Sequence, residues 1–175
     1  MTMTPGPRKF VLTAHVIFSV GWLGTVAGFL PLAIASLTSQ DTQTVRAAFL
    51  TMELMGWFAL VPLSLASLFT GLVQSLGTKW GLFRHYWVLF KLLITTISTV
   101  ILLAYMQTLS YLAGMAGETT LSGADLRGLA GSPVLHSSAA LLALLTATTL
   151  SVYKPRGMTP YGWRKQHERR MVQQP

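Results

Sequence analysis

Hydrophobic residues fall into four long runs that are separated by short polar segments. Each run is long enough to cross a bilayer, which needs about 20 predominantly apolar residues. The runs lie near residues 10–37, 48–75, 87–113 and 133–153. Pro62 predicts a kink in the second run, and Ser132 and Pro133 predict the start of the fourth helix. The pattern as a whole predicts an all-α protein, a four-helix transmembrane bundle.

The composition supports a membrane protein and changes how the net charge is interpreted. The chain is 51% hydrophobic and only 10% charged, whereas soluble domains carry about 25% charged residues. The net charge is +8, but the basic residues flank the hydrophobic runs, as they do in membrane proteins. We therefore expect a lipid bilayer as partner and no nucleic acid. The sequence contains no cysteine, which excludes disulfides and thiolate metal sites.

The distribution of basic residues predicts an orientation in the membrane. Ten lysines and arginines lie in the N-terminal segment, the second loop and the C-terminal tail, and two lie in the first and third loops. Because positive charge marks the cytoplasmic side, both termini should be cytoplasmic. This predicts a multi-pass protein of the inner (plasma) membrane.

The chain divides into a membrane domain and a short tail. Residues 1–153 form the predicted four-span domain, and residues 154–175 form a polar, basic, cytoplasmic tail with three prolines. We expect the tail to be mobile and to lie near anionic headgroups, where each basic side chain contributes about 1 kcal/mol of attraction. The sequence leaves the oligomeric state open, including a homo-oligomer.

His15 is the one ionisable side chain in the first run. Ionisable groups in a membrane interior cost about 2.5–3.5 kcal/mol near its centre, so each suggests a functional site. At a rise of about 1.5 Å per residue, His15 lies roughly 7 Å and Lys91 about 6 Å from the cytoplasmic ends of their spans. The two side chains are thus predicted to share one inner layer. The structural alternatives are a packing histidine and a lysine that extends to the cytoplasmic headgroups.

Two patterns in the first run predict which side of its helix faces the bundle. His15, Ser19 and Trp22 are spaced to lie on one stripe, and a tryptophan near mid-depth is placed to pack against a helix or a flat cofactor. Gly24 and Gly28 form the small-xxx-small pattern "GTVAG", which favours close approach of a neighbouring helix. Both patterns predict that this side of the helix faces protein.

A second layer is predicted near the outer face. Glu53 and His136 each lie perhaps 5–8 Å from the outer end of their spans by the same rise, so they could be neighbours. Imidazole and the soft sulfur of nearby methionines suit copper(I), which makes His136 a second candidate metal ligand. His15 and His136 lie in different layers and are therefore not predicted to be the two axial ligands of one haem.

Two motifs resemble a group of bacterial membrane proteins. "HVIFSVGWLG" in the first span and "HYWVLFKLLIT" in the third are similar to motifs of the membrane-embedded protoporphyrinogen oxidases, the copper-resistance permease domain and small integral membrane proteins of unknown function. The last group is the most similar overall. The resemblance covers roughly half of the chain. It implies a b-type haem held by His15 and Lys91. If a haem is bound there, we expect Trp22 to pack nearby.

Three functions are compatible with these features. The first is a haem-binding membrane protein that carries out redox or electron-transfer chemistry, in which the axial ligands and burial would set the potential. The second is a transporter or copper-handling component that uses the outer layer. The third is a non-catalytic membrane partner or assembly subunit. No phosphate loop, dinucleotide-binding pattern or nucleophile elbow is present, and the sequence does not decide whether the protein is an enzyme.

Overall fold

The computed structural model confirms an all-α fold. It describes residues 3–77, 82–83, 85–118, 122–153, 155 and 157–172. Lys79, Arg84, Lys154 and Arg156, which contribute to the predicted charge asymmetry, lie outside the described residues. The elements are α1 (Pro5–Thr38), α2 (Thr42–Met55), the π-helical turn η1 (Gly56–Leu60), α3 (Val61–Gly77), α4 (Tyr86–Gly117), α5 (Gly123–Leu129), α6 (Gly131–Tyr153) and α7 (Pro160–Val172).

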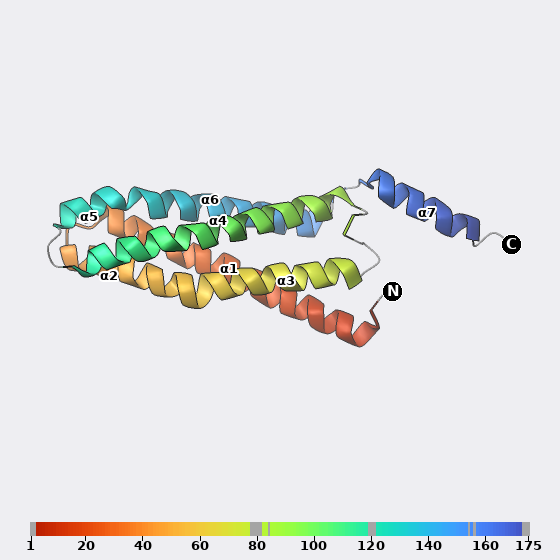
Figure 1. Ribbon diagram of the computed structural model, residues 1–175, viewed down its shortest axis with the longest axis horizontal. Coiled ribbons are helices and arrows are strands. Elements are labelled where there is room, and N and C mark those ends of the chain that lie inside the picture. The colour runs from red at the N-terminus through yellow and green to blue at the C-terminus, as the bar shows by residue number, and fades with distance from the viewer. Residues whose placement is uncertain are drawn as a thin grey trace.

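Four long apolar helices form the bundle that the hydrophobic runs predict (Figure 1). The second span is the continuous helix of α2, η1 and α3, and α5 is a short helix before the fourth span. Helix α1 packs against the second span and α6, and α4 packs against the same two neighbours. Helices α1 and α4 therefore lie diagonally across the bundle, so side chains from both can meet in its centre.

Both chain ends lie at the same end of the bundle, and α5 lies at the opposite end (Figure 1). This arrangement follows from an even number of spans. It places the starts of α1, α4 and α7 and the end of α3 at one end of the bundle. The turn between α1 and α2 lies at the other end with α5.

The second span contains a π-helical turn directly before its proline. Pro62 has no N–H to donate to the carbonyl group four residues earlier, and its ring would clash with that carbonyl group. In the π turn, the Val61 N–H instead bonds to the Gly56 carbonyl oxygen, five residues back. Gly56 also permits close packing, because a Cβ built there would lie 2.6 Å from Met106 Cε. The predicted irregularity at Pro62 thus takes the form of a widened turn.

Two short loops at the α5 end are organised by capping residues. Asp41 begins α2, and its carboxylate accepts hydrogen bonds from the Gln43 and Thr44 backbone N–H groups at 3.2 and 3.0 Å. These bonds satisfy N–H groups that have no partner within the helix. Ser122 forms a reciprocal capping box at α5. Helix α6 begins at Gly131, so the prediction that Ser132 caps the fourth helix is wrong.

One of the two patterns in α1 correctly predicts which side of the helix faces the bundle interior. His15, Trp22 and Phe29 are buried, which confirms the stripe that contains the histidine. Gly24 and Gly28 are exposed. A Cβ built on Gly24 would meet nothing within 4 Å, and one on Gly28 would lie 3.9 Å from Met55 Cε of α2, which is ordinary contact. The close helix approach that "GTVAG" predicts is therefore not found within this bundle. The two glycines lie on the opposite side of α1 from the buried stripe.

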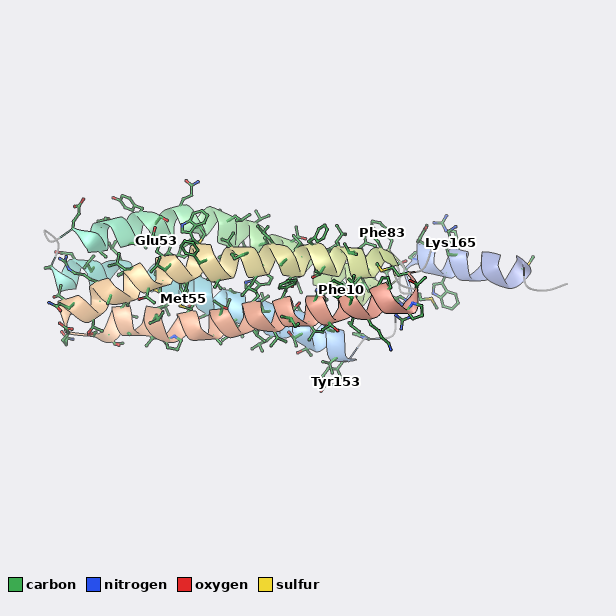
Figure 2. The ribbon with its side chains drawn as sticks, turned by 90° about the horizontal axis from the view of Figure 1, so that it is seen from below. Phe10, Glu53, Met55, Phe83, Tyr153 and Lys165 are labelled. Atoms are coloured by element: carbon green, nitrogen blue, oxygen red, sulfur yellow. The ribbon has the colours of Figure 1, made fainter. Side chains whose placement is uncertain are left out.

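Large apolar side chains cover the outside of the bundle along its length (Figure 2). Ile17, Phe58 and Val100, from three different spans, are 61%, 80% and 60% exposed. Monomeric soluble proteins rarely expose apolar surface of this extent, and in lipid it costs nothing. The protein is thus a multi-pass integral membrane protein. Tyr153 projects from the end of α6 (Figure 2), where amphipathic aromatic rings favour a membrane interface.

The tail contains a helix that begins close to the segment before α4. Met158 pairs with His85 as an isolated antiparallel bridge, and the Thr159 hydroxyl donates to the Phe83 carbonyl oxygen. The same hydroxyl accepts a bond from the Gly162 backbone N–H at 3.1 Å, in the first turn of α7. These bonds connect the start of the tail to the segment before α4, and the mobility of the rest of the tail stays a prediction.

Candidate functional site

The His15 imidazole is buried between α1 and α3 in a fixed orientation. Its Nδ1 lies 3.1 Å from the Ser67 carbonyl oxygen and 3.1 Å from Thr70 Oγ1. A carbonyl oxygen can only accept, and the Thr70 hydroxyl already donates to the Ala66 carbonyl oxygen at 2.7 Å. Nδ1 must therefore carry the proton. This leaves the lone pair on Nε2, on the other side of the ring.

Lys91 reaches this lone pair from the diagonal helix α4. Its Nζ lies 3.2 Å from His15 Nε2, so the Lys91 amino group donates a hydrogen bond to the imidazole. Ser19 Oγ lies 3.5 Å from Nε2 and 2.8 Å from Ser67 Oγ. The contact confirms that His15 and Lys91 share one layer. It contradicts the alternative in which Lys91 extends to the headgroups, because the amine points into the bundle.

Gly71 allows α3 to approach the imidazole. A Cβ built on Gly71 would lie 2.9 Å from His15 Cε1 and 3.4 Å from Nδ1. The first distance is shorter than real Cβ atoms show. A larger residue at position 71 would displace the ring from Ser67 and Thr70. This glycine therefore belongs to the site, although it contributes no chemical group.

A cavity of about 100 Å³ lies beside the pair, with walls from α1, α3 and α4. Its lining includes His15, Gln74, Trp87 and Lys91. Gln74 Oε1 is buried and has no hydrogen-bond partner among the described residues. A buried polar atom without a partner is costly, so the cavity is suited to a ligand that carries a polar group.

Trp22 does not line this cavity. It is buried at 2% exposure and lines a second, larger cavity of about 350 Å³. The two cavities share no lining residue. Trp22 lies two turns along α1 from His15, and this distance separates it from the space beside the imidazole. In this structure Trp22 is therefore not placed to pack against a cofactor that His15 would hold beside the first cavity.

His136 lies in the second cavity, as its prediction in a separate layer requires. Its Nδ1 donates to the Ser132 carbonyl oxygen at 2.9 Å, and its ring stacks on Tyr105 with centroids 3.9 Å apart and planes 16° from parallel. Glu53 is not among the residues that line this cavity. Glu53 lies in the half of the bundle remote from α7 (Figure 2), which agrees with its predicted depth.

The sequence analysis did not identify several residues of these sites. Polar or small residues recur on one side of α3 at positions 64, 67, 71 and 74, with a spacing of three or four residues. That periodicity, in an otherwise apolar helix, could have predicted the surroundings of His15. Tyr105 lies in an apolar run with no comparable signal.

His15 and Lys91 are, among the described residues, the predicted metal ligands that lie close to each other. Among the described residues, no group of three or more histidine, aspartate and glutamate side chains is placed to hold a metal ion. A metal between two nitrogen ligands needs them about 4 Å apart, because each bond is about 2.0–2.1 Å long. His15 and Lys91 are 3.2 Å apart and bond to each other. The donor types fit an iron porphyrin, but the spacing would have to widen by about 1 Å. The cavity of about 100 Å³ beside the pair would also have to open to the size of a ligand site, about 300–1,000 Å³.

Comparison with protein-family models, curated proteins and solved structures finds no match for this chain.

Proposed function

We propose that this integral membrane protein binds a b-type haem through the His15–Lys91 pair and takes part in redox or electron-transfer chemistry in the inner membrane. The observation that carries the proposal is the orientation of His15, whose Nδ1–H donates to the Ser67 carbonyl oxygen while Nε2 faces the bundle centre. Histidines that bind metals almost always donate their other N–H to a carbonyl, carboxylate or water, which fixes the tautomer and the ring.

Lys91 has two roles that suit such a cofactor. As a neutral amine it would be a second nitrogen ligand, and as an ammonium it would pair with a haem propionate. Gln74 lines the same cavity with an unpaired amide oxygen, which would accept a hydrogen bond from a protonated carboxyl group. The bound haem would supply one-electron chemistry, and its axial ligands and burial would set the potential.

The orientation of the protein is part of this proposal. The His15 layer lies in the half of the bundle near the chain ends, which the basic residues assign to the cytoplasmic side. Arg164 and Lys165 in α7 would then lie near anionic headgroups of the inner leaflet. The haem would therefore be held close to the cytoplasmic face.

The experiment is a reduced-minus-oxidised absorbance spectrum of protein purified after expression with ample haem. We expect a Soret band and α/β bands in the wild type. His15→Ala should remove most of the haem, because a primary ligand is lost. Lys91→Ala should shift the bands or weaken haem retention. His136→Ala is the matched control, because this histidine lines the other cavity, and it should retain haem with an unchanged spectrum.

Two results would contradict the proposal. A wild-type protein without a Soret band, although folded and supplied with haem, would exclude haem binding. Haem that is lost in His136→Ala and retained in His15→Ala would move the ligand to the second cavity. Loss of haem in His15→Ala supports the proposal only when the variant unfolds at a detergent concentration close to that of the wild type. An unfolded variant would lose any cofactor.

The direct hydrogen bond between Lys91 and His15 favours a second candidate, which is proton transfer across this inner layer. An ammonium group that donates to an imidazole lone pair at 3.2 Å is in position to pass its proton to the ring. Proteoliposomes with a trapped pH indicator would test this function. Lys91→Met should abolish a proton flux that the wild type supports, and equal fluxes in both proteins would exclude it.

A further inference from the structure

The second cavity is a mostly apolar chamber lined by residues of α1, η1, α4 and α6. Its volume of about 350 Å³ lies within the range of small-molecule sites. Its lining includes Ile97 and Ile101, which are 48% and 52% exposed, and the exposed Ala139, so the chamber reaches the outer surface of the bundle. Because these residues lie on the membrane-spanning helices, a ligand would enter from the lipid.

The space exists because α6 carries small residues on the side that faces α4 and α1. Ala140 and Ala143 follow His136 at intervals of four and seven residues and line the cavity with it. Residues with this spacing share one face of a helix. Trp22 and Phe29 of α1 form the opposite wall and are almost fully buried. The cavity is therefore bounded by aromatic rings on one side and methyl groups on the other.

Two stacked residues that line this chamber, His136 and Tyr105, carry a hydrogen-bond acceptor and a hydrogen-bond donor. Since His136 Nδ1–H donates to the Ser132 carbonyl oxygen, Nε2 carries the lone pair. The Tyr105 hydroxyl accepts a bond from Ser132 Oγ at 3.3 Å, which leaves its own proton available to donate to a ligand. The stacked rings hold both groups in place.

We infer that this cavity binds a lipid-soluble hydroquinone. A hydroquinone oxygen can donate its proton to His136 Nε2 and accept the Tyr105 hydroxyl proton, so a single hydroxyl group satisfies both side chains. The flat ring matches the aromatic walls, where offset or edge-to-face ring contacts are favourable. A quinone carbonyl can only accept, so it satisfies Tyr105 and leaves His136 Nε2 without a donor. The site therefore prefers the reduced form.

This inference does not depend on haem binding, because the two cavities share no lining residue. It makes no statement about electron transfer. Loss of the His15 site would leave the hydroquinone site intact, and a protein without haem is a suitable sample for the test. His15→Ala should therefore bind hydroquinone as the wild type does, which separates the failure of one proposal from that of the other.

The test is displacement of tritiated decylhydroquinone from immobilised full-length protein in detergent, under anaerobic conditions. We expect saturable binding, with unlabelled decylhydroquinone competing about 2- to 10-fold better than decylquinone, the effect of one hydrogen bond. His136→Phe keeps the stacked ring but removes Nε2, and Tyr105→Phe removes the hydroxyl proton. Each should weaken binding by a similar factor. The control Tyr111→Phe, on an exposed tyrosine of α4, should have no effect.

A filling variant provides a second measurement. Ala140→Leu should abolish binding because the larger side chain occupies the cavity, whereas Ala104→Leu on the exposed side of α4 should bind normally. Absence of saturable binding would overturn the inference. Equal competition by decanol would show that an alkyl alcohol, and no aromatic ring, is recognised, which would also overturn it. If Ala140→Leu fails to fold, unchanged affinity in both His136→Phe and Tyr105→Phe would contradict it independently.

Discussion

Replacing Gly71 with alanine places a methyl group against the His15 imidazole. The new Cβ would lie 2.9 Å from His15 Cε1, whereas carbon atoms in favourable contact are about 3.5–4.0 Å apart. The ring must therefore move by about 0.5–1 Å, or α3 must withdraw by that distance. Movement of the ring lengthens the Nδ1 bonds to Ser67 and Thr70. Either response weakens the arrangement that presents Nε2 to Lys91.

The energetic cost of this clash can be measured by comparing Gly71→Ala with the same substitution at an uncrowded glycine. Overpacking of this kind costs about 1–3 kcal/mol, while a helical Gly→Ala change gains up to about 1 kcal/mol in helix propensity. Gly24→Ala has the same propensity gain without the clash, because its Cβ would meet nothing within 4 Å. We therefore expect Gly71→Ala to be less stable than Gly24→Ala by about 1–3 kcal/mol in the free energy of unfolding.

The assay is reversible unfolding in mixed micelles with increasing dodecyl sulfate, followed by circular dichroism. A double-mutant cycle with His15→Ala completes it, since removal of the imidazole leaves room for the methyl group. The penalty of Gly71→Ala should largely disappear in the His15→Ala background, which gives a coupling energy of about 1–3 kcal/mol. Equal stability of Gly71→Ala and Gly24→Ala, or a penalty that persists without the imidazole, would refute the reasoning.

Two further predictions concern the loops. Hydrogen bonds from the Thr44 side chain, the Thr44 backbone and the Gln43 backbone lower the pKa of the Asp41 carboxyl below 3.8. The stabilisation by this cap is therefore fully present above the pKa of Asp41 in the unfolded chain. It is lost as the pH falls through the pKa of Asp41 in the folded protein. A carboxyl titration by NMR should give a value below 3.8, and one above it would contradict the cap. Reporter fusions at Lys79 and at the C-terminus should be cytoplasmic and a fusion at Gln40 external. The reverse pattern would contradict the charge argument.

The four spans and the depth of their ionisable residues were predictable because the bilayer imposes a simple rule. A helix must be apolar over about 20 residues to cross it, so the runs in the sequence mark the helices. A constant rise per residue then places His15 and Lys91 at similar depths. Their contact at 3.2 Å confirms this estimate, although the two residues are far apart in the chain and come from diagonal helices.

The rotation of a helix about its own axis was only partly predictable. Helix α1 is almost entirely apolar, so few of its residues indicate an orientation. The stripe of His15 and Trp22 correctly predicted the buried side, whereas the glycine pattern at Gly24 and Gly28 suggested the exposed side. Trp22 was correctly expected to be buried, but it lies in the cavity with His136, two turns away from the imidazole beside which it was expected.

The details of both sites depend on contacts between residues that are distant in the sequence. The tautomer of His15 follows from the Ser67 carbonyl oxygen of α3, and the stack of Tyr105 on His136 follows from the packing of α4 against α6. Close packing leaves space where side chains are too small to fill it, as Ala140 and Ala143 are opposite the aromatic wall. The sequence by itself determined which residues lie at each depth in the membrane. The tertiary structure decided which of them share a cavity, because hydropathy depends on position along the helix and a contact also depends on direction around it.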